Sequence, residues 1–511
     1  MTQNTSSNNK LIAKNTAMLY FRMLFIMFIS LFTSRVIIDA LGIVDYGIYN
    51  VVGGFVAMFA LVSNSLTSAC SRFISYEIGI GSQESIQKVF TTTIIIHYLL
   101  AIIIAILCEG FGLWYINNKM LIPVDRLLAA NYVFHISVLN FCTNLITIPY
   151  NAAIIAHNRM KIFAYVSIFE GLGRLAICYL VMYVPSDRLV SYAWFYLGIQ
   201  FIVRLMYQYY CRKKIIKGPI KFVFDVDLLK RIFSYSGWHI IGNSIALVNR
   251  QGADLILNSF FGPVLNAAKG ISNQVLAAVS GFAGNFMVAL NPQITQSYAR
   301  GDYSYMINLI DRGARFSFYM MLMLSLPIIL NTDYILEIWL NDVPEFSSPM
   351  VKISLITAMV GVLSNTLIVA QNATGKIRTY QIVIGGILLL NLPASFFFLK
   401  FGASPLAVLI VALFIEVCCL IGRLVVIRRN INAFNSIDYL IKVVGNCCKV
   451  ALISSIIPVI VVFYMGKNIY SFLIVSVISV ICTAIVIAFI GCSKGERKFL
   501  FELVKSKVFK K

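Results

Sequence analysis

Long apolar runs alternate with short polar segments along the whole chain. The runs are about twenty residues long, which an α-helix needs to cross a hydrocarbon core of ~30 Å. The sequence contains fourteen such runs, of which the seventh and eighth are the most polar. They span 16–38, 48–69, 89–116, 129–150, 162–184, 189–210, 235–257, 267–290, 312–330, 350–371, 380–399, 405–427, 439–464 and 470–490.

Composition supports the same interpretation. Of the 511 residues, 59% are hydrophobic and 12% are charged, whereas about a quarter of the residues are charged in a soluble protein. The first run is followed by Arg35 instead of a small-residue cleavage site, so we expect a retained helix and not a signal peptide. The sequence therefore predicts an all-α integral membrane protein and excludes a cytosolic enzyme.

The formal net charge is +21. A nucleic-acid partner is not expected, because the basic residues lie between the apolar runs and not on one water-facing patch. Basic loops tend to stay in the cytosol, and most Lys and Arg residues share one side with both termini, notably in 212–231 and 494–511. We therefore expect both termini to be cytosolic. The opposite side holds Lys119, Arg126, Arg188, Lys400 and Lys467.

An internal repeat is visible when the chain is shifted by 220 residues, which aligns Gly42 with Gly262 and Gly81 with Gly301. At a shift of 217, HNRMKIFAYV aligns with TGKIRTYQIV. Each repeat holds six runs, an even number, so both copies enter the membrane in the same direction. This is typical of transporters built from parallel repeats.

The repeat predicts two six-helix bundles followed by two further helices. The expected segments are a cytosolic N-terminal tail, the first bundle, a basic linker, the second bundle, the two extra helices and a basic cytosolic tail. Their ranges are 1–15, 16–210, 211–233, 234–430, 431–491 and 492–511.

Several kinds of chemistry have no support in the sequence. The eleven cysteines and four histidines lack metal-ligand spacing, so no metal site is expected. There is no phosphate-binding loop, no zinc-protease motif and no nucleophile elbow. Large loops that could hold an active site are also missing. We expect a protein that is not an enzyme and has no cofactor.

Four basic residues inside the predicted spans stand out, namely Arg22, Arg174, Arg250 and Lys269, of which Arg174 and Arg250 are the deepest by sequence position. A charge near the bilayer centre costs about 2.5 to 3.5 kcal/mol on the insertion scale, so these residues are candidates for an anion-binding site. Two of them also have an acid at i,i+4 that could neutralise them. The possible pairs are Glu170 with Arg174 and Arg250 with Asp254.

Polar stripes follow helical spacing on the second and eighth spans, and they include Asn50, Asn273 and Lys269. Such faces are typical of helices that line a water-filled cavity, although close packing through small residues is an alternative. Three acids inside spans, Glu170, Asp254 and Glu416, are candidates for coupling transport to a proton or sodium gradient.

Three stretches carry a resemblance to a known family: LYFRMLFIMFISLFTSRVIIDALGIVDYGIYNVVGGFVAMFA from Leu19, SYSGWHIIGN from Ser234 and LILNSFFGPVLNAAKGISNQV from Leu255. With the spans and the repeat, they resemble Wzx-type polysaccharide (O-antigen) flippases of the multidrug/oligosaccharidyl-lipid/polysaccharide exporter superfamily. The resemblance implies a MATE-like fold, in which two bundles face a central cavity and work by alternating access.

The same resemblance implies the cargo and the location. The cargo would be an undecaprenyl-pyrophosphate-linked oligosaccharide, moved from the inner to the outer leaflet of the bacterial inner membrane for lipopolysaccharide synthesis. Partners would be membrane lipids, a polysaccharide polymerase and the chain-length machinery. The cationic candidates suit an anionic pyrophosphate, because Arg binds phosphate bidentately.

Three alternatives stay open. A multidrug exporter of the same fold is the nearest. Such exporters typically carry an acidic coupling residue in the first bundle, whereas the first helix here offers Arg22 and no acid before Asp39. A lipid II flippase would share the lipid pyrophosphate. A membrane polysaccharide polymerase or ligase is a different class, and it would need a substantial outer loop.

Overall fold

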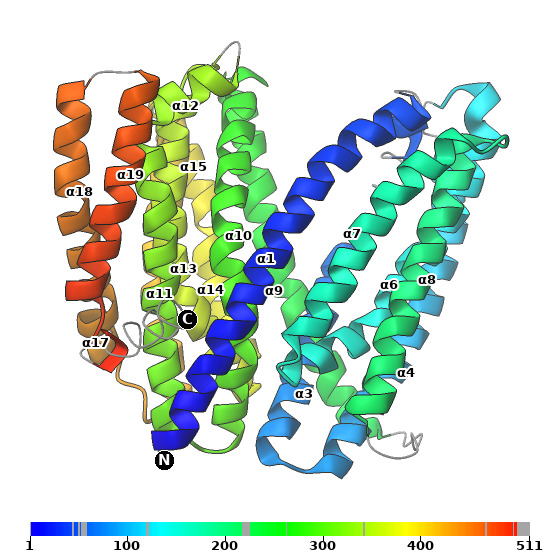
Figure 1. Cartoon of the computed structure of the whole chain (residues 1–511), viewed down its shortest axis with the longest axis horizontal. Coiled ribbons are helices and arrows are strands. Elements are labelled where there is room, and N and C mark those ends of the chain that lie inside the picture. Colours follow the sequence, from blue (N-terminus) through cyan, green and yellow to red (C-terminus); the bar gives the residue numbers. More distant parts are fainter. Residues whose placement is uncertain are drawn as a thin grey trace, which may run out of the picture. The chain divides into compact units, whose positions relative to one another are not determined.

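The structure is a computed structural model of the chain, and it describes residues 2–42, 45–49, 52, 59–118, 122–216, 225–261, 263–340, 343–465, 468–493 and 495–497. All regular elements in these ranges are helices. Eleven of them are long and apolar enough to cross a membrane. The predicted all-α, multi-pass membrane protein is therefore confirmed (Figure 1). Residues 50, 51 and 53–58 of the second predicted span, 48–69, lie outside the described residues.

The chain divides into two compact units, which we call unit 1 and unit 2. Unit 1 comprises 1–243 and 295–301, and unit 2 comprises 244–294 and 302–511. The division falls inside two long helices, α9 (Val226–Phe261) and α10 (Pro263–Ala299). The two ends of each of these helices thus belong to different units. The domain bounds of 16–210 and 234–430 stay a prediction.

Unit 1 is built around a row of packed helices. Helix α1 packs on α7, α7 on α8, α8 on α6, and α6 on both α3 and α4. A π-helical turn, η1, continues α4 into the short α5. The bounds are α1 Thr2–Leu41, α3 Ala60–Ile80, α4 Gln83–Leu107, η1 Cys108–Gly112, α5 Leu113–Asn118, η2 Val124–Arg126, α6 Leu127–Ala156, α7 Met160–Met182 and α8 Arg188–Lys214.

Unit 2 repeats that packing order. Helix α16 packs on α14 and α15 and on α13, and α13 packs on α11. The last two membrane helices, α18 and α19, pack on each other and on α11 (Figure 1). The bounds are α11 Tyr303–Leu330, α12 Thr332–Trp339, α13 Ser347–Thr374, α14 Ile377–Leu389, α15 Asn391–Lys400, α16 Ala407–Asn430, α17 Ser436–Tyr439, η3 Leu440–Gly445, α18 Asn446–Met465, α19 Ile469–Val486 and η4 Ile487–Gly491.

The local geometry at helix ends supports the internal repeat. Gly81 and Gly301, aligned at a shift of 220, both have positive φ, at 87° and 74°. The next residue in each copy caps a helix: Ser82 accepts a hydrogen bond from the backbone of Ser85, and Asp302 accepts one from Tyr305. The two copies therefore end one helix and start the next in the same way.

The second aligned segment behaves likewise. Asn158 and Gly375, aligned at a shift of 217, have φ values of 56° and 75°. Only Gly enters this region without steric cost, although Asn tolerates it. In the alignment each of these residues separates a long helix from the next one, α6 from α7 and α13 from α14. The same backbone conformation thus recurs at matching positions of the two aligned segments.

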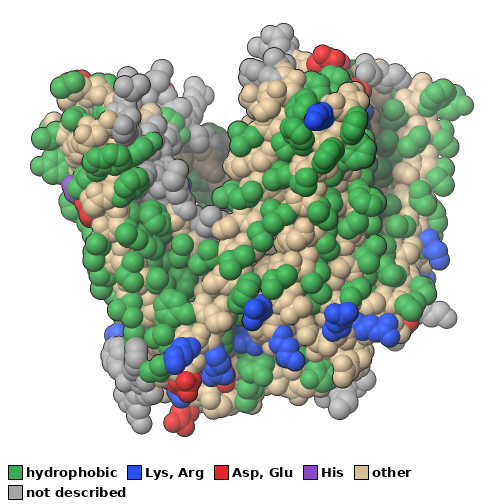
Figure 2. All heavy atoms as spheres, turned by 180° about the vertical axis from the view of Figure 1, so that it is seen from behind, with side chains coloured by type: hydrophobic (Ala, Val, Ile, Leu, Met, Phe, Trp, Pro, Cys, Tyr) green, Lys and Arg blue, Asp and Glu red, His purple; other side chains and the backbone are tan. Residues whose placement is uncertain are grey.

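Charge is distributed unevenly along the helices. Figure 2 shows Lys and Arg side chains gathered toward the lower end of the visible face, below a broad hydrophobic zone. Helix α1 begins at the lower end in Figure 1. The cytosolic location of the termini stays a prediction.

Candidate functional site

A polar network links α7 and α8 inside unit 1. Arg174 Nη2 donates a hydrogen bond to Tyr196 Oη at 2.5 Å, and the guanidinium lies 4.6 Å from the centre of the same ring. One turn along α8, Gln200 Nε2 donates to Glu170 Oε1 at 2.7 Å and to Tyr196 Oη at 3.1 Å. The network therefore runs from the cation to the carboxylate through a hydroxyl and an amide.

The i,i+4 pair proposed between Glu170 and Arg174 is not among the ion pairs of the described residues. The physical reason is the neighbouring helix. A pair on one helix face contributes only about 0.2 to 0.5 kcal/mol, whereas α8 offers Arg174 a hydroxyl and a ring face and offers Glu170 an amide donor. The described contacts of the Arg174 guanidinium are therefore with neutral groups, a hydroxyl and an aromatic ring.

Arg22 lies on α1 close to the same helix α7. Its Nη1 donates to Ser167 Oγ at 3.3 Å, and its guanidinium lies 4.5 Å from the centre of the Phe163 ring. The side chain is half-buried. The packing of α1 on α7 thus brings Arg22 to the helix that carries Glu170 and Arg174.

A row of tyrosines extends the network. Tyr192 stacks on Tyr196 at 6.3 Å between ring centres, and Tyr49 meets Tyr192 edge-on at 5.2 Å. Sequence reasoning missed these residues. The signal was present, because Tyr192, Tyr196 and Gln200 are spaced i, i+4 and i+8 and form a polar stripe on the sixth span.

Unit 2 holds a buried ion pair between α9 and α10. Lys269 Nζ lies 2.7 Å from Asp254 Oδ1, and the Lys269 side chain is 9% exposed against 33% for Asp254. Asp254 therefore pairs across to α10 and not with Arg250 on its own helix. Lys269 keeps its place inside the span because this carboxylate neutralises it.

Arg250 is exposed, and the hydrogen bonds and ion pairs of the described residues do not include it. Its neighbours explain the placement. Asn249 accepts a hydrogen bond from Asn391 Nδ2 at 2.7 Å, and Ala253, one turn on, packs in an apolar cluster with Leu399 of α15. Because Arg250 is one position further round the helix, it lies beside this packed face and outside it.

Glu416 has a strong partner on its own helix. Arg423 Nη1 donates to Glu416 Oε1 at 2.7 Å, and Arg423 is 8% exposed. The structure thus buries Arg423 against a carboxylate two turns away on the same helix. Gly361 of α13 lies against Glu416, since a Cβ there would come within 3.6 Å of Oε1.

The two asparagines predicted to line a cavity have different outcomes. Asn50 lies outside the described residues, and Asn273 is exposed on α10. Among the described residues, no group of three or more His, Cys, Asp or Glu side chains could hold a metal ion.

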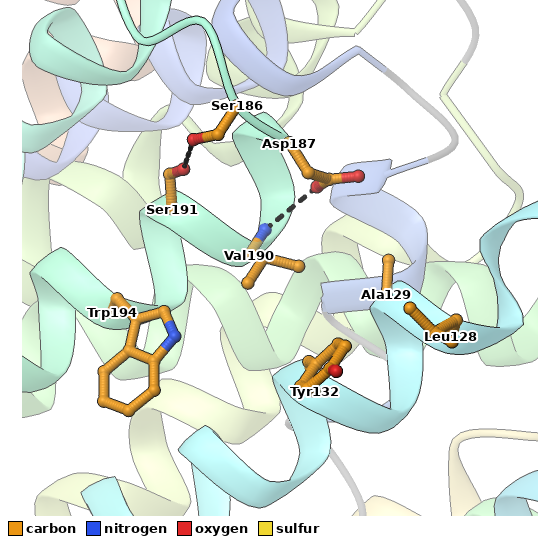
Figure 3. Close-up of a pocket in the computed structure, with 8 residues that line it drawn as sticks. All are labelled: Leu128, Ala129, Tyr132, Ser186, Asp187, Val190, Ser191 and Trp194. Atoms are coloured by element: carbon orange, nitrogen blue, oxygen red, sulfur yellow. Dashed lines mark hydrogen bonds between the residues drawn. The ribbon is translucent and has the colours of Figure 1, made fainter.

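Near the start of α6 and α8, unit 1 has a pocket of about 330 Å³. Figure 3 shows Ser186, Asp187 and Ser191 at one side and the rings of Tyr132 and Trp194 at the other. The Ser186 and Ser191 hydroxyls are 2.9 Å apart and share a hydrogen bond. The remaining lining residues are Leu128, Ala129 and Val190.

Asp187 connects this pocket to neighbouring charged residues at the helix ends. It caps α8 by accepting a hydrogen bond from the Val190 backbone, and its carboxylate forms an ion pair with Arg126 at 2.5 Å. Arg126 also pairs with Asp45 at 2.5 Å. Partial burial would raise the pKa of Asp187, but the Arg126 and backbone hydrogen bonds outweigh it and lower that pKa below its usual value.

Comparison with known proteins shows the fold. No protein-family model matches the chain, and no curated relative matches it. Solved structures do match. An outward-facing multidrug resistance MATE family transporter of the MOP superfamily shares 11% identity at a TM-score of 0.70, covering 83% of this chain and 96% of that one.

Two further structures give the same result. A variant of a MATE transporter from Vibrio cholerae shares 15% identity at a TM-score of 0.70, over 86% of this chain and 100% of that one. A MOP superfamily transporter from Pyrococcus furiosus, described as having a binding pocket of reversed polarity, shares 12% identity at 0.66, over 83% and 96%. The chain has the fold of MATE transporters, and the predicted MATE-like fold is confirmed.

Proposed function

We propose that this protein is a transporter that moves a lipid-linked oligosaccharide with an anionic diphosphate across the bacterial inner membrane by alternating access. The fold supports the transporter class, since the matching structures are transporters. The substrate class is supported by the cations inside the membrane helices and by the sequence resemblance. The product would feed a polysaccharide polymerase and its chain-length machinery at the outer leaflet.

The main support for the proposal is the depth and exposure of two arginines in the membrane helices and their lack of a carboxylate partner among the described residues. Arg174 is eight residues from the end of α7, about 12 Å into the helix. Arg250 is eleven residues from the end of α9, about 16 Å in. Both are exposed, and neither has a carboxylate partner among the ion pairs of the described residues.

A cation at that depth is costly in lipid, so it is expected to face water or an anion. A diphosphate supplies the missing negative charge and accepts the forked hydrogen bonds of a guanidinium. Arg22 is the third candidate ligand, on the helix next to Arg174. We assign Lys269 a supporting role, because Asp254 already neutralises it.

Coupling to an ion gradient, with no bound cofactor, is part of the proposal. Of the three candidate acids, Asp254 and Glu416 pair with buried cations, whereas Glu170 accepts its described hydrogen bond from the neutral amide of Gln200. Glu170 is therefore the acid best suited to exchange a proton or a sodium ion. It shares its network with Arg174, so a change in its charge would act on the proposed anion site.

The test is to measure undecaprenyl-linked lipids by mass spectrometry in a strain that lacks the gene. Complete oligosaccharide units should accumulate, and the wild-type gene should remove them while an expressed Arg174→Gln gene does not. An unchanged lipid pool would contradict the proposal.

A multidrug exporter is the second candidate, because matching structures include multidrug transporters and Glu170 could serve a cationic drug. This function predicts that loss of the gene raises drug sensitivity and leaves the lipid pool unchanged. The same pair of measurements therefore distinguishes the two functions.

A further inference from the structure

The pocket between α6 and α8 opens on a surface that suits a membrane lipid. On α6, Leu128 and Tyr132 are 70% and 53% exposed, and on α8, Trp194 is 53% exposed. Each helix begins near the pocket, so these residues lie within the first two turns of α6 and α8, at one end of a membrane span. Tyr and Trp at this depth are typical of the level of lipid headgroups.

Beyond the pocket, small and apolar residues continue along one face of α8. Gly198 lies one turn after Trp194 and leaves the helix surface open, since a Cβ there would meet nothing within 4 Å. Phe201 and Leu205 follow on the same face and are 47% and 46% exposed. The polar end of the pocket is thus followed by an apolar track along the helix, which matches a headgroup followed by a hydrocarbon chain.

The polar end carries an excess of negative charge. Arg126 is shared by the two carboxylates of Asp45 and Asp187, so this triad has a net charge of about −1. The eight residues that line the pocket include Asp187 and no Lys or Arg. The Asp187 side chain is 34% exposed and can accept further hydrogen bonds.

We propose that this pocket binds a phospholipid with a primary ammonium headgroup, such as an ethanolamine phospholipid, in the leaflet opposite the cytosol. The ammonium group donates hydrogen bonds to the Asp187 carboxylate and to the hydroxyls of Ser186 and Ser191. A hydrocarbon chain lies against Tyr132 and Trp194 and continues past Gly198. The site is separate from the Arg174 network and does not depend on the identity of the transported substrate.

The geometry also sets the expected selectivity. A primary ammonium group can donate to a carboxylate, whereas the quaternary ammonium of choline lipids cannot. A glycerol headgroup leaves the phosphate charge unbalanced beside Asp187, and like charges repel. Because a charge-assisted hydrogen bond contributes about 1.5 to 3 kcal/mol, we expect ethanolamine lipid to bind at least ~10-fold more tightly than choline or glycerol lipid.

The test uses the purified full chain, stripped of lipid and titrated with ethanolamine, choline or glycerol phospholipid of the same chain length, with native mass spectrometry as the readout. Trp194→Ala should weaken retention of ethanolamine lipid. The control is Trp114→Ala, which removes another exposed tryptophan of unit 1 that does not line the pocket. Asp187→Asn keeps a good helix cap and should remove the preference for ethanolamine over choline lipid.

A photoactivatable ethanolamine lipid provides a second readout that does not rely on a variant. Labelling should map to the first turns of α6 and α8. Equal retention of the three lipids, equal effects of Trp194→Ala and Trp114→Ala, or labelling elsewhere would overturn the proposal. Displacement of the lipid by tetraphenylphosphonium at matching affinity would also overturn it, because the pocket would then be a site for lipophilic cations.

Discussion

The buried pair of Lys269 and Asp254 gives a quantitative prediction about unit 2. In Asp254→Asn the ammonium group of Lys269, whose side chain is 9% exposed, loses the carboxylate 2.7 Å away. Removing one partner of a buried pair costs about 3 to 5 kcal/mol. Because Asp254 is one-third exposed, water can replace part of that interaction, and we expect a loss of about 2 to 3 kcal/mol.

The reverse change should cost less. Lys269→Met removes the buried charge and fills a similar volume, and the Asp254 carboxylate that remains has access to water. We expect a loss of about 1 kcal/mol or less. The double variant should then be close to Lys269→Met alone, which corresponds to a coupling energy of about 2 kcal/mol in the cycle.

The assay is the free energy of unfolding of the wild type, the two single variants and the double variant, measured by denaturant titration in detergent. The control is the exposed pair of Lys352 and Asp333, whose charged atoms are 3.8 Å apart. Exposed pairs contribute about 0 to 1 kcal/mol, so Lys352→Met should change stability little. Additive effects of Asp254→Asn and Lys269→Met would refute the reasoning.

Three further predictions concern stability, each measured as a thermal melting temperature in detergent. A Cβ at Gly79 would lie 2.5 Å from Ala299 Cβ and 2.7 Å from a backbone oxygen, so Gly79→Ala should cost about 1 to 3 kcal/mol. The control Gly198→Ala has open space and should be neutral or stabilising; equal effects at the two sites would contradict the packing argument. Gly301→Ala forces a φ of 74° on a residue with a Cβ and should cost about 1 to 2 kcal/mol, with no loss if that conformation is not required. The hydrogen bond from Lys88 lowers the pKa of Asp225 to about 2, so Asp225→Asn should lower the melting temperature at pH 7 but not at pH 2. The sign follows because a depressed carboxyl pKa stabilises the fold above about pH 4, and this contribution disappears as the pH falls toward 2; an effect of equal size at both pH values would show that the charge is not responsible.

Most of the fold could be predicted from the length and spacing of the apolar runs. An apolar run of about twenty residues has few stable solutions other than a membrane helix, and the repeat offset of the glycines anticipated matching helix ends such as Gly81 and Gly301. The extra short elements were not predictable from hydropathy. Helix α14 ends at Leu389 and α15 begins at Asn391, so the single run 380–399 contains two helices.

The candidate site was less predictable, because spacing along one helix does not identify partners on the next. Glu170 and Arg174 satisfy i,i+4 spacing, yet their described contacts are with Gln200 and Tyr196 of α8. Likewise, the depth of a residue in sequence does not fix its exposure. Arg423, seven residues from the end of α16, is buried, whereas Arg250, eleven residues from the end of α9, is exposed.

The central claim is that exposed arginines in the membrane helices bind a lipid diphosphate. The most direct measurement is the affinity of the purified chain for undecaprenyl diphosphate, with undecaprenol as the neutral probe. Arg204→Gln is the matched control, because Arg204 also donates to a tyrosine hydroxyl, that of Tyr98, at 2.5 Å, but is half-buried, whereas Arg174 and Arg250 are exposed. We predict that Arg174→Gln and Arg250→Gln each weaken diphosphate binding by about 10- to 100-fold, whereas Arg204→Gln does not. Equal affinity for the diphosphate and the neutral lipid, or equal binding by all three variants, would contradict the account.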